Sequence, residues 1–432
     1  ISQPWYPQVK LREQTYRKEY VQLYINVIKK IIDSEDNSRG FSGSSPSNGL
    51  ETEQEGWIAK NPGDRLYGDT HYYNYGSKPL NWKQYPTSRF GSEYGLESYP
   101  SVQTLASVTN QSDLVYPIDN KSLFEHRQHH PAGRVQIRKM VETYFDTPAP
   151  GGVERFNDFV YLTQIIQAMA MKIETEFYRT NRAVDSKTGL GYTMGALYWQ
   201  LNDIWQAPTW ASIEFTGKWK MLQYFAKKMF DNLLVSAHDE NDQLKVYIVR
   251  DDLLKEVTFT VSIHVMKWSS FSRPFSKYQN VSTPSGLTAT LVPNESITHL
   301  LSSAKCQSRF DCFIYVEIQN KTLGLYADNF WFLEHALKNA TGLTKANLKV
   351  AEVTQVTKVV NSNETTFKIK LQADSVAPYV WLDFNYKANI NGTFSDNGFL
   401  MLNQSKQISF TSNEQITVNQ IKTNFSLYFF NL

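Results

Sequence analysis

One carboxylate in this sequence stands in a setting suited to chemistry. The stretch RFGSEYGLESYPS, residues 89–101, places Glu93 among small residues at the end of a strand-like segment. A glutamate at the carboxyl end of a barrel strand lies on the face that carries the active site in (β/α)₈ enzymes. The same side chain could instead cap the next helix or pair with Arg89. Position alone leaves both interpretations open, so the surrounding elements have to decide.

The first half of the chain has the periodicity of alternating strands and helices. Apolar residues recur three and four positions apart in three segments: 18–32, 158–178 and 216–230. Four strand-like segments accompany them: 39–49, 65–76, 88–95 and 193–205. Repeated strand-then-helix units predict parallel strands. Four such units make half of a (β/α)₈ TIM barrel, and we expect the other half to precede Ile1.

The periodicity changes from helical to two at about Asn232. In VTFTVSIHV, alternate positions are apolar and are predicted to face a core: Val257, Phe259, Val261, Ile263 and Val265. Further strands are predicted at 312–318, 367–372, 407–411 and 415–421. Strands of this length separated by polar turns favour antiparallel sandwiches. Asn397-Gly398 predicts a turn, because these residues accept the positive φ that a tight turn requires.

These patterns predict a multidomain protein that combines α/β and all-β folds. We expect the C-terminal half of a (β/α)₈ barrel over residues 1–231, a β-sandwich over 232–338 and a second, immunoglobulin-like β-sandwich over 339–432. A short helical segment near residues 333–343 marks the predicted boundary between the two sandwiches.

Composition excludes several classes of partner. The formal charge is +2 and there is no basic run, so a nucleic-acid partner is not expected. No apolar run approaches the roughly 18 residues that span a bilayer, so no membrane partner is expected. The chain starts with ISQPWYPQVK, without an initiator methionine or a signal-peptide pattern, and is predicted to be part of something longer.

Two features indicate an oxidising compartment. Cys306 and Cys312 lie in KCQSRFDC without a second Cys or His pair nearby, which favours a small-loop disulfide over a zinc site; two free buried thiols are the alternative. Ten asparagines stand two residues before Ser or Thr, more than composition alone gives. They are Asn110, Asn120, Asn280, Asn294, Asn320, Asn339, Asn363, Asn391, Asn403 and Asn424. A secreted or lysosomal protein is predicted.

The wording of several motifs carries a resemblance to a known family. SEYG at 92–95 resembles the nucleophile motif of glycoside hydrolase family 2, which includes β-galactosidases, β-glucuronidases and β-mannosidases. The segment 195–226 and the motifs SSPSNG, GDTHYY, HRQHH and FSDNGFLM resemble the β-mannosidases of this family in particular. The resemblance runs along nearly the whole chain in the same order.

The resemblance implies a role for individual residues. Glu93 would be the nucleophile of a retaining glycosidase, which uses two carboxylates about 5–5.5 Å apart. A tyrosine would hydrogen-bond this carboxylate, with Tyr75 as the choice. His71 would lie near the sugar hydroxyls, or else fix loop geometry, and Trp199 would be the platform under the sugar. Trp205 and Trp210 are expected to wedge the following loop, which Asn202 and Asp203 would hold.

The sequence departs from the family in one respect. The family's acid/base glutamate lies in an Asn-Glu motif before the helix predicted at 18–32, and no such motif stands there. The three Asn-Glu pairs that occur lie in the β-rich half, where they predict turns: Asn294-Glu295, Asn363-Glu364 and Asn413-Glu414. We expect the acid/base to come from an N-terminal half that would be the partner of this chain.

The leading hypothesis is an exo-acting β-mannosidase that removes terminal β-mannose from oligosaccharides of N-glycan breakdown. Neither a metal nor another cofactor is implied, because no His/Asp/Glu cluster has ligand spacing. Three alternatives remain open: a family 2 hydrolase for another β-glycoside, a catalytically silent carbohydrate-binding or scaffold protein of the same fold, and a secreted β-sandwich adhesion protein. The last accounts only for residues 232–432.

Overall fold

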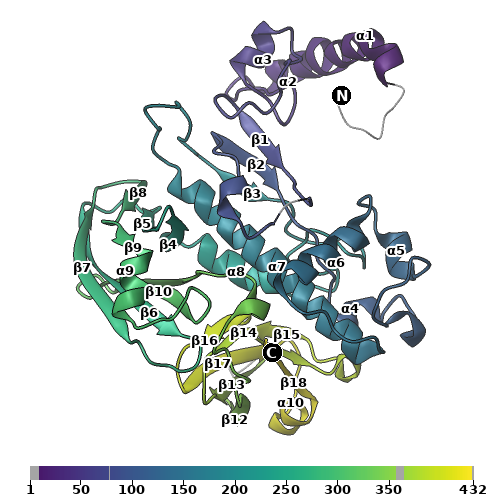
Figure 1. Ribbon diagram of the computed structural model, residues 1–432. Helices are drawn as coiled ribbons and strands as arrows, with labels where there is room; N and C mark the ends of the chain where they lie inside the picture. The colour runs from purple at the N-terminus through teal and green to yellow at the C-terminus, as the bar shows by residue number, and fades with distance from the viewer. Residues whose placement is uncertain (1–8, 77, 357–363, 431–432) are drawn as a thin grey trace. The chain divides into compact units, whose positions relative to one another are not determined.

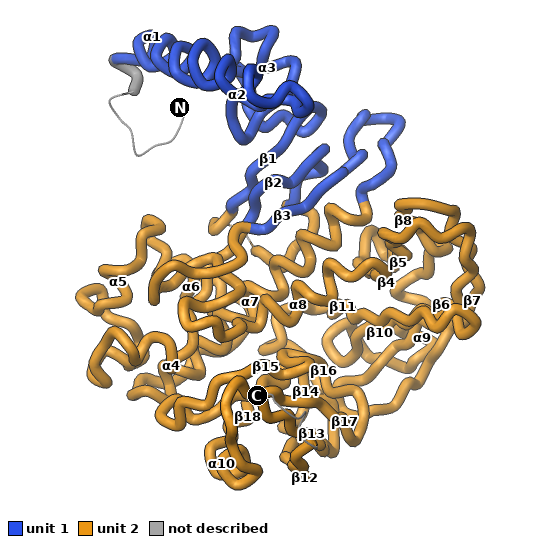
Figure 2. The backbone as a smooth tube through the Cα atoms, turned by 180° about the vertical axis from the view of Figure 1, so that it is seen from behind, with its two compact units in different colours: residues 1–73, 85–94, 181–198 blue, residues 74–84, 95–180, 199–432 orange. Residues whose placement is uncertain are grey.

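The computed structural model describes residues 9–76, 78–356 and 364–430 (Figure 1). The chain divides into two compact units, coloured separately in Figure 2. Unit 1 comprises residues 1–73, 85–94 and 181–198, and unit 2 comprises residues 74–84, 95–180 and 199–432.

Unit 1 begins with a helical run. It consists of α1 (Val9–Tyr20), the π-helical η1 (Val21–Lys29) and α2 (Lys30–Glu35), and the short α3 (Leu50–Gln54) follows. The helix predicted over 18–32 is confirmed. Within its apolar stripe Ile25 is buried, whereas Tyr24, Ile31 and Ile32 are 42%, 57% and 41% exposed. Only part of the stripe therefore packs against other described residues.

Three parallel strands complete unit 1. They are β1 (Asp69–Tyr72), β2 (Phe90–Tyr94) and β3 (Ala196–Tyr198), with β2 in the centre. The parallel direction and three of the four predicted strand positions are confirmed.

The fourth strand, predicted over 39–49, is wrong. These residues are all described, and they form bends and irregular loop rather than a strand. Ser47 does lie beside the start of β1, where its carbonyl accepts from the Asp69 N–H at 3.0 Å. Its own N–H, however, donates to the Asp69 carboxylate at 2.6 Å. A strand paired with β1 would need backbone N–H groups along its length, and Pro46 has none. The Ser47 N–H bonds to the Asp69 side chain and not to the backbone of β1, so no strand ladder forms here.

The helices of unit 2 centre on the 28-residue α7 (Val153–Thr180), most of which is buried. It packs against α8 (Met221–Met229) and α6 (Gly133–Tyr144). The shorter helices are η2 (Trp82–Gln84), α4 (Val102–Leu105), η3 (Gln111–Asp113) and α5 (Leu123–Arg127). The helices predicted over 158–178 and 216–230 are confirmed, although α8 begins later than predicted because a turn with Gly217 at φ +85° precedes it.

A first group of antiparallel strands follows α8 in unit 2. One sheet has the order β11-β10-β6-β7, and the other contains β4, β5 and β8, with β9 beside β5. The strands are β4 (Leu233–Glu240), β5 (Gln243–Arg250), β6 (Val257–Lys267), β7 (Phe275–Thr283), β8 (Thr288–Leu291), β9 (Glu295–Ser296), β10 (Cys312–Asn320) and β11 (Leu325–Phe332), with α9 (Ile297–Ser303) between β9 and β10. All five core positions predicted in β6 are buried.

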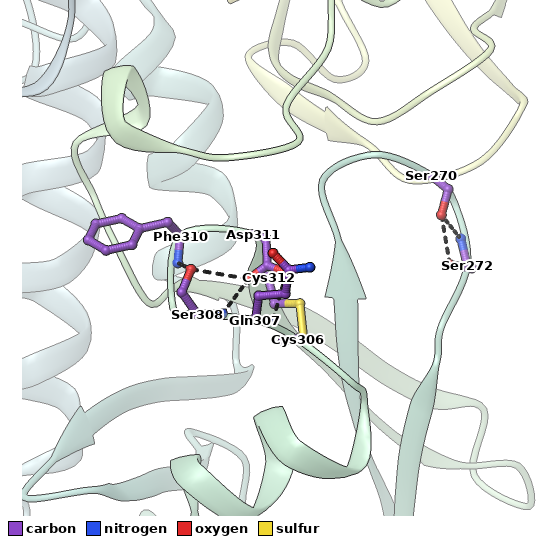
Figure 3. Close-up of a disulfide and its surroundings, with 8 residues drawn as sticks. All are labelled: Ser270, Ser272, Cys306, Gln307, Ser308, Phe310, Asp311 and Cys312. Atoms are coloured by element: carbon purple, nitrogen blue, oxygen red, sulfur yellow. Dashed lines mark hydrogen bonds between the residues drawn. A yellow bond between two sulfur atoms is a disulfide. The ribbon is translucent and has the colours of Figure 1, made fainter.

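The predicted disulfide between Cys306 and Cys312 is confirmed and closes the loop that enters β10 (Figure 3). The Asp311 carboxylate holds the same loop, accepting from the N–H groups of Gln307 at 3.0 Å and Ser308 at 2.9 Å. This short loop is therefore fixed both covalently and by hydrogen bonds.

A second group of antiparallel strands ends the chain. One sheet has the order β12-β13-β17-β15 and the other β16-β14-β18. The strands are β12 (Lys349–Gln355), β13 (Thr365–Gln372), β14 (Ala377–Phe384), β15 (Gly392–Phe394), β16 (Phe399–Met401), β17 (Ser405–Ser412) and β18 (Phe425–Tyr428). The predicted turn at Asn397-Gly398 is present, with Gly398 at φ +67°, and it joins strands of different sheets.

Two local predictions in this half are wrong. Residues 415–421 were predicted as a strand, but α10 (Val418–Asn424) starts there because Thr417 and Gln420 form a reciprocal capping box. The helical segment near 333–343 contains only a 3₁₀ turn, η4 (Leu337–Asn339), and a second such turn is η5 (Tyr386–Ala388). The domain boundaries at 231 and 338 stay predictions. Across the described ranges, no helix is long and apolar enough to cross a membrane.

Candidate active site

Glu93 and His71 lie side by side on neighbouring parallel strands of unit 1. The register of β1 and β2 places His71 opposite Glu93, just after an irregularity between Thr70 and His71. The His71 Nδ1 atom lies 3.2 Å from the Glu93 Oε2 atom, and the two side chains are 24% and 29% exposed. The carboxylate is therefore reachable from solvent while one of its oxygens faces an imidazole.

A tyrosine hydroxyl contacts the other oxygen of Glu93. The Tyr73 hydroxyl donates to Glu93 Oε1 at 2.6 Å. This is a hydrogen bond of the kind expected of Tyr75. Tyr73 was not chosen from the sequence, and the role of Tyr75, which belongs to unit 2, stays a prediction. The signal was in the sequence: residues two apart in an extended segment point the same way, which puts Tyr73 on the side of His71.

A hydrogen-bond network behind His71 was not predicted. Asp69 Oδ2 accepts from the hydroxyls of Ser45 at 2.5 Å and Ser92 at 2.6 Å. The Ser45 oxygen also lies 2.8 Å from His71 Nε2. Since the single Ser45 hydrogen goes to Asp69, the Ser45 oxygen accepts from Nε2–H of His71. Asp69 thus orients Ser45, and Ser45 orients the ring whose other nitrogen faces Glu93.

The network explains what each of the two carboxylates can do. Asp69 has partners on both oxygens, because the Ser47 N–H also donates to Oδ1 at 2.6 Å. It is 19% exposed and acts as a fixed acceptor. Glu93 is positioned from both sides and more open, which is the arrangement that suits a nucleophile or a ligand-binding carboxylate.

The remaining predicted site residues belong to unit 2. The Tyr75 hydroxyl accepts from the Trp210 indole N–H, and the Tyr75 ring lies 4.2 Å from the His130 ring. Trp199 directly follows β3 and is 45% exposed. Trp205 lies against Arg127, whose guanidinium carbon is 5.1 Å from the ring centroid.

The loop after β3 is held largely as predicted. The Asn202 amide donates to the Asp203 carbonyl at 3.2 Å. Asp203 holds the loop by a bond between side chains, in which its carboxylate accepts from the Thr209 hydroxyl at 2.6 Å. The two tryptophans lie in this loop with the contacts given above.

A buried cluster of titratable groups in unit 2 was not predicted from the sequence. The Lys220 ammonium is buried and donates to the Ser98 carbonyl and the Thr209 carbonyl, each at 3.2 Å. Glu97 is 2% exposed, and burial raises its pKa to about 8 although Lys220 opposes the shift. Burial also lowers the pKa of Lys220. No spacing rule would have found these groups, because they meet only through the tertiary fold.

The three Asn-Glu pairs belong to unit 2, whereas Glu93 belongs to unit 1. Glu295 opens β9 in unit 2 and forms an ion pair with Lys277. Asn413-Glu414 follows β17 in the same unit. Of the third pair, Asn363 lies outside the described residues, as does its predicted glycosylation.

Comparison with known proteins gives consistent results. The family model Ig_mannosidase, an Ig-fold domain, matches residues 348–431. A β-mannosidase of Capra hircus is 38% identical over 98% of this chain and 46% of its own length, and a probable β-mannosidase of Caenorhabditis elegans is 32% identical over 94% and 45%. The crystal structure of a β-D-mannosidase from Dictyoglomus thermophilum matches with a TM-score of 0.75 at 22% identity, over 95% of this chain and 45% of that one.

The fold and these similarities define a relative of the glycosidases. More specifically, the chain is homologous to β-mannosidases along nearly its whole length, as the sequence motifs predicted, and it corresponds to a C-terminal portion of them. It spans about half the length of the curated relatives that it matches.

Proposed function

We propose that this chain supplies the nucleophile of a retaining exo-β-mannosidase. The observation that carries the proposal is the position of Glu93, held by Tyr73 at 2.6 Å and His71 at 3.2 Å while remaining open to solvent. In a retaining mechanism one Glu93 oxygen attacks the anomeric carbon, and a second carboxylic acid protonates the leaving oxygen. The substrate would be a terminal, non-reducing β-D-mannose of an oligosaccharide from N-glycan breakdown.

The second carboxylic acid would come from the N-terminal half of the protein. Within unit 1, Asp69 is already committed to Ser45, Ser92 and the Ser47 N–H, so it is not a free proton donor. In the proposed arrangement β1, β2 and β3 belong to the C-terminal half of a (β/α)₈ barrel. Their carboxyl ends, where Glu93 and His71 lie, would form the active face. His71 and Trp199 are proposed to contact the sugar hydroxyls and the sugar ring.

Hydrolysis of an aryl β-mannoside tests this proposal. We expect activity when the chain is combined with its upstream half, and none from the chain alone. In the full-length protein, Glu93→Gln should lower kcat by at least about 10³-fold, as removal of a nucleophile does. Glu352→Gln, on the exposed surface of β12, is the matched control and should leave kcat unchanged. Activity of Glu93→Gln within tenfold of the parent contradicts the assignment.

A catalytically silent carbohydrate-binding protein is the second candidate. It is favoured by the absence of a second uncommitted carboxylate beside Glu93 among the described residues of unit 1. The same experiment separates the two: a well-folded full-length protein that binds mannosides without hydrolysing them would replace the enzyme with the silent binder.

A secreted or lysosomal location is proposed from the sequons. Six of the asparagines are exposed: Asn110, Asn120, Asn280, Asn294, Asn339 and Asn403. In the half-buried Asn320, Asn391 and Asn424 the amide nitrogen donates to a backbone carbonyl. Glycopeptide mapping should therefore find glycans first at the exposed group. Glycans on the half-buried asparagines, with none on the exposed asparagines, would contradict this order.

A further inference from the structure

One face of a sheet in unit 2 carries an unusual set of side chains. Directly paired residues of an antiparallel sheet lie on the same face, and so do residues two apart along a strand. In the sheet β11-β10-β6-β7 one face packs in the core through residues such as Phe259, Val261 and Ile263. The opposite face carries aromatic, acidic and hydroxyl side chains in three rows. The rows are Phe330-Tyr315-His264-Ser276, Asp328-Glu317-Ser262-Tyr278 and Tyr326-Gln319-Thr260-Asn280.

Exposed aromatic rings on this face are held by hydrogen bonds. Tyr326 is 54% exposed and Tyr278 is 65% exposed. The Tyr326 hydroxyl donates to Glu317 Oε1 at 2.9 Å, and Glu317 Oε2 accepts from the Arg273 guanidinium at 2.9 Å. The Tyr326 ring is thus presented in a fixed orientation, with its surface open to solvent.

A cavity of about 220 Å³ adjoins the β11 edge of this face. From the sheet it is lined by Tyr315, Tyr326, Asp328 and Phe330, and from α8 and β17 by Lys228 and Lys406. It lies wholly within unit 2. Drug-sized ligands occupy pockets of roughly 300–1,000 Å³, so a cavity of this size suits a ligand as small as a monosaccharide.

The two lysines at the cavity have an acidic partner, whereas the acidic side chain of Asp328 has no basic one among the described residues. Asp396 accepts from both lysines, from Lys228 at 3.0 Å and from Lys406 at 2.8 Å. Asp328 accepts from the Tyr315 hydroxyl at 3.2 Å, and within the described part of the chain no ion pair neutralises it. The lysine charges are therefore satisfied within the protein, while a carboxylate with spare acceptor capacity faces the cavity.

We propose that this face and its cavity form a second, non-catalytic binding site for a neutral hexose. The apolar face of a pyranose would stack on Tyr326, and two neighbouring hydroxyls would donate to the Asp328 carboxylate. Lys228, with a side chain that is 63% exposed, would donate to a sugar oxygen. An anionic ligand is disfavoured because Asp328 and Glu317 line the approach. The site uses none of Asp69, His71 or Glu93, so it goes beyond the proposed catalysis and does not depend on it.

The hexose has two possible sources. One is a free oligosaccharide, and the other is a glycan attached to this chain. Asn280 is an exposed sequon on β7 of the same sheet, and the Thr260 hydroxyl donates to its side-chain oxygen at 3.1 Å. Three strand spacings of about 4.8 Å separate β7 from β11, a distance that an attached oligosaccharide can span.

Saturation-transfer NMR and calorimetry on the complete chain test the proposal. Mannose, glucose and N-acetylglucosamine are the probes, and affinities of about millimolar are expected for ligands of this size. Tyr326→Ala and Asp328→Ala should each weaken binding by about tenfold or more. Phe310→Ala removes another exposed aromatic ring, 39% exposed in the loop before β10, and should leave binding unchanged. Tyr326 is exposed, so its truncation should leave the thermal unfolding midpoint unchanged.

Four outcomes decide between the proposal and its rejection. Binding that Tyr326→Ala weakens supports the site, and binding of free sugar that appears only in Asn280→Gln supports it with the attached glycan as the natural occupant. If none of the three sugars binds to either the parent chain or Asn280→Gln, the proposal is overturned. It is equally overturned if binding persists in Tyr326→Ala and disappears in Glu93→Gln, because the sugar would then occupy the candidate active site alone.

Discussion

One carboxylate oxygen of Glu93 accepts a hydrogen bond from the Tyr73 hydroxyl, and the other oxygen faces the His71 ring. A hydrogen bond to a charged carboxylate is stronger than one between neutral groups, and it fixes the direction in which the free lone pairs point. His71 is itself held through Ser45 and Asp69. The reactivity of Glu93 should therefore depend on a short chain of polar contacts across β1 and β2.

We expect Tyr73→Phe and Tyr75→Phe to affect the full-length protein in different ways. A hydrogen bond to a charged group contributes about 1.5–3 kcal/mol, so loss of the Tyr73 hydroxyl should lower kcat by about 10- to 100-fold. Tyr75→Phe removes the acceptor for the Trp210 indole and should cost about 1 kcal/mol of stability with little change in kcat. Steady-state kinetics with thermal unfolding of both variants checks this. Equal losses of kcat would show that Tyr73 has no special role.

At the scale of elements, the short helix α10 depends on its first turn. The Thr417 hydroxyl accepts from the Gln420 N–H at 3.2 Å, and the Gln420 side chain accepts from the Thr417 N–H at 2.9 Å. We expect Thr417→Ala to destabilise the chain by about 1 kcal/mol, since an N-cap contributes that much. Thr423→Ala, an exposed position inside the same helix, is the control and should be neutral or slightly stabilising because alanine favours helix. Denaturant unfolding of both variants measures the difference, and equal midpoints would rule out the capping argument.

The elements that sequence patterns predicted well are those with a long, one-sided apolar pattern. α7 and β6 are examples, because burial of one face determines both their type and their register. The pattern misled at residues 415–421, where alternating Ile and Val favoured a strand. The Thr417–Gln420 pair in the same segment is a helix-capping motif, and it indicated the helix that the alternating pattern did not. The short, proline-containing segment 39–49 forms an irregular loop, because the Asp69 carboxylate accepts from the Ser47 N–H that a strand would have used.

Some residues of the candidate site could be predicted from the sequence, and others could not. Glu93 and His71 could be predicted because they stand in a motif with a family resemblance. The Ser45–Asp69–Ser92 network could not, since its members come from three separate segments and meet only when β1 and β2 pair. Tyr73 lay within reach of sequence reasoning, because its spacing from His71 puts both on one side of an extended segment.

At the scale of the whole molecule, several buried acids retain their protons more strongly than usual. Burial raises the pKa of Glu97 to about 8 from an ordinary value of 4.5, and it raises the pKa of Glu174 well above its usual range. Burial has the opposite consequence for two histidines, because it lowers the pKa of His238 and of His335 to about 4. These groups bind different numbers of protons in the folded and unfolded chain, so stability must vary with pH.

The direction of that dependence follows from the signs. Between pH 4.5 and 8 the folded chain holds a proton on Glu97 that the unfolded chain has released, so the stabilisation is complete below 4.5 and is lost as pH rises through 8. His238 and His335 act the other way, because the unfolded chain takes up their protons first as pH falls below about 6.5. Stability should therefore be greatest in mildly acidic solution and should decline towards pH 8.5.

Glu97→Gln tests this at one position. An amide cannot ionise, so the variant should lose most of the decline in thermal midpoint between pH 6 and pH 8.5 that the parent shows. One proton of difference between the two states changes the stability by about 1.4 kcal/mol for each pH unit, so Glu97 accounts for about 3 kcal/mol of the decline between pH 6 and 8. Glu352→Gln, exposed on β12, is the control and should keep the parent's profile. Parallel pH profiles for the parent and Glu97→Gln would mean that another group governs the decline, with Glu174, buried on α7, the next to replace.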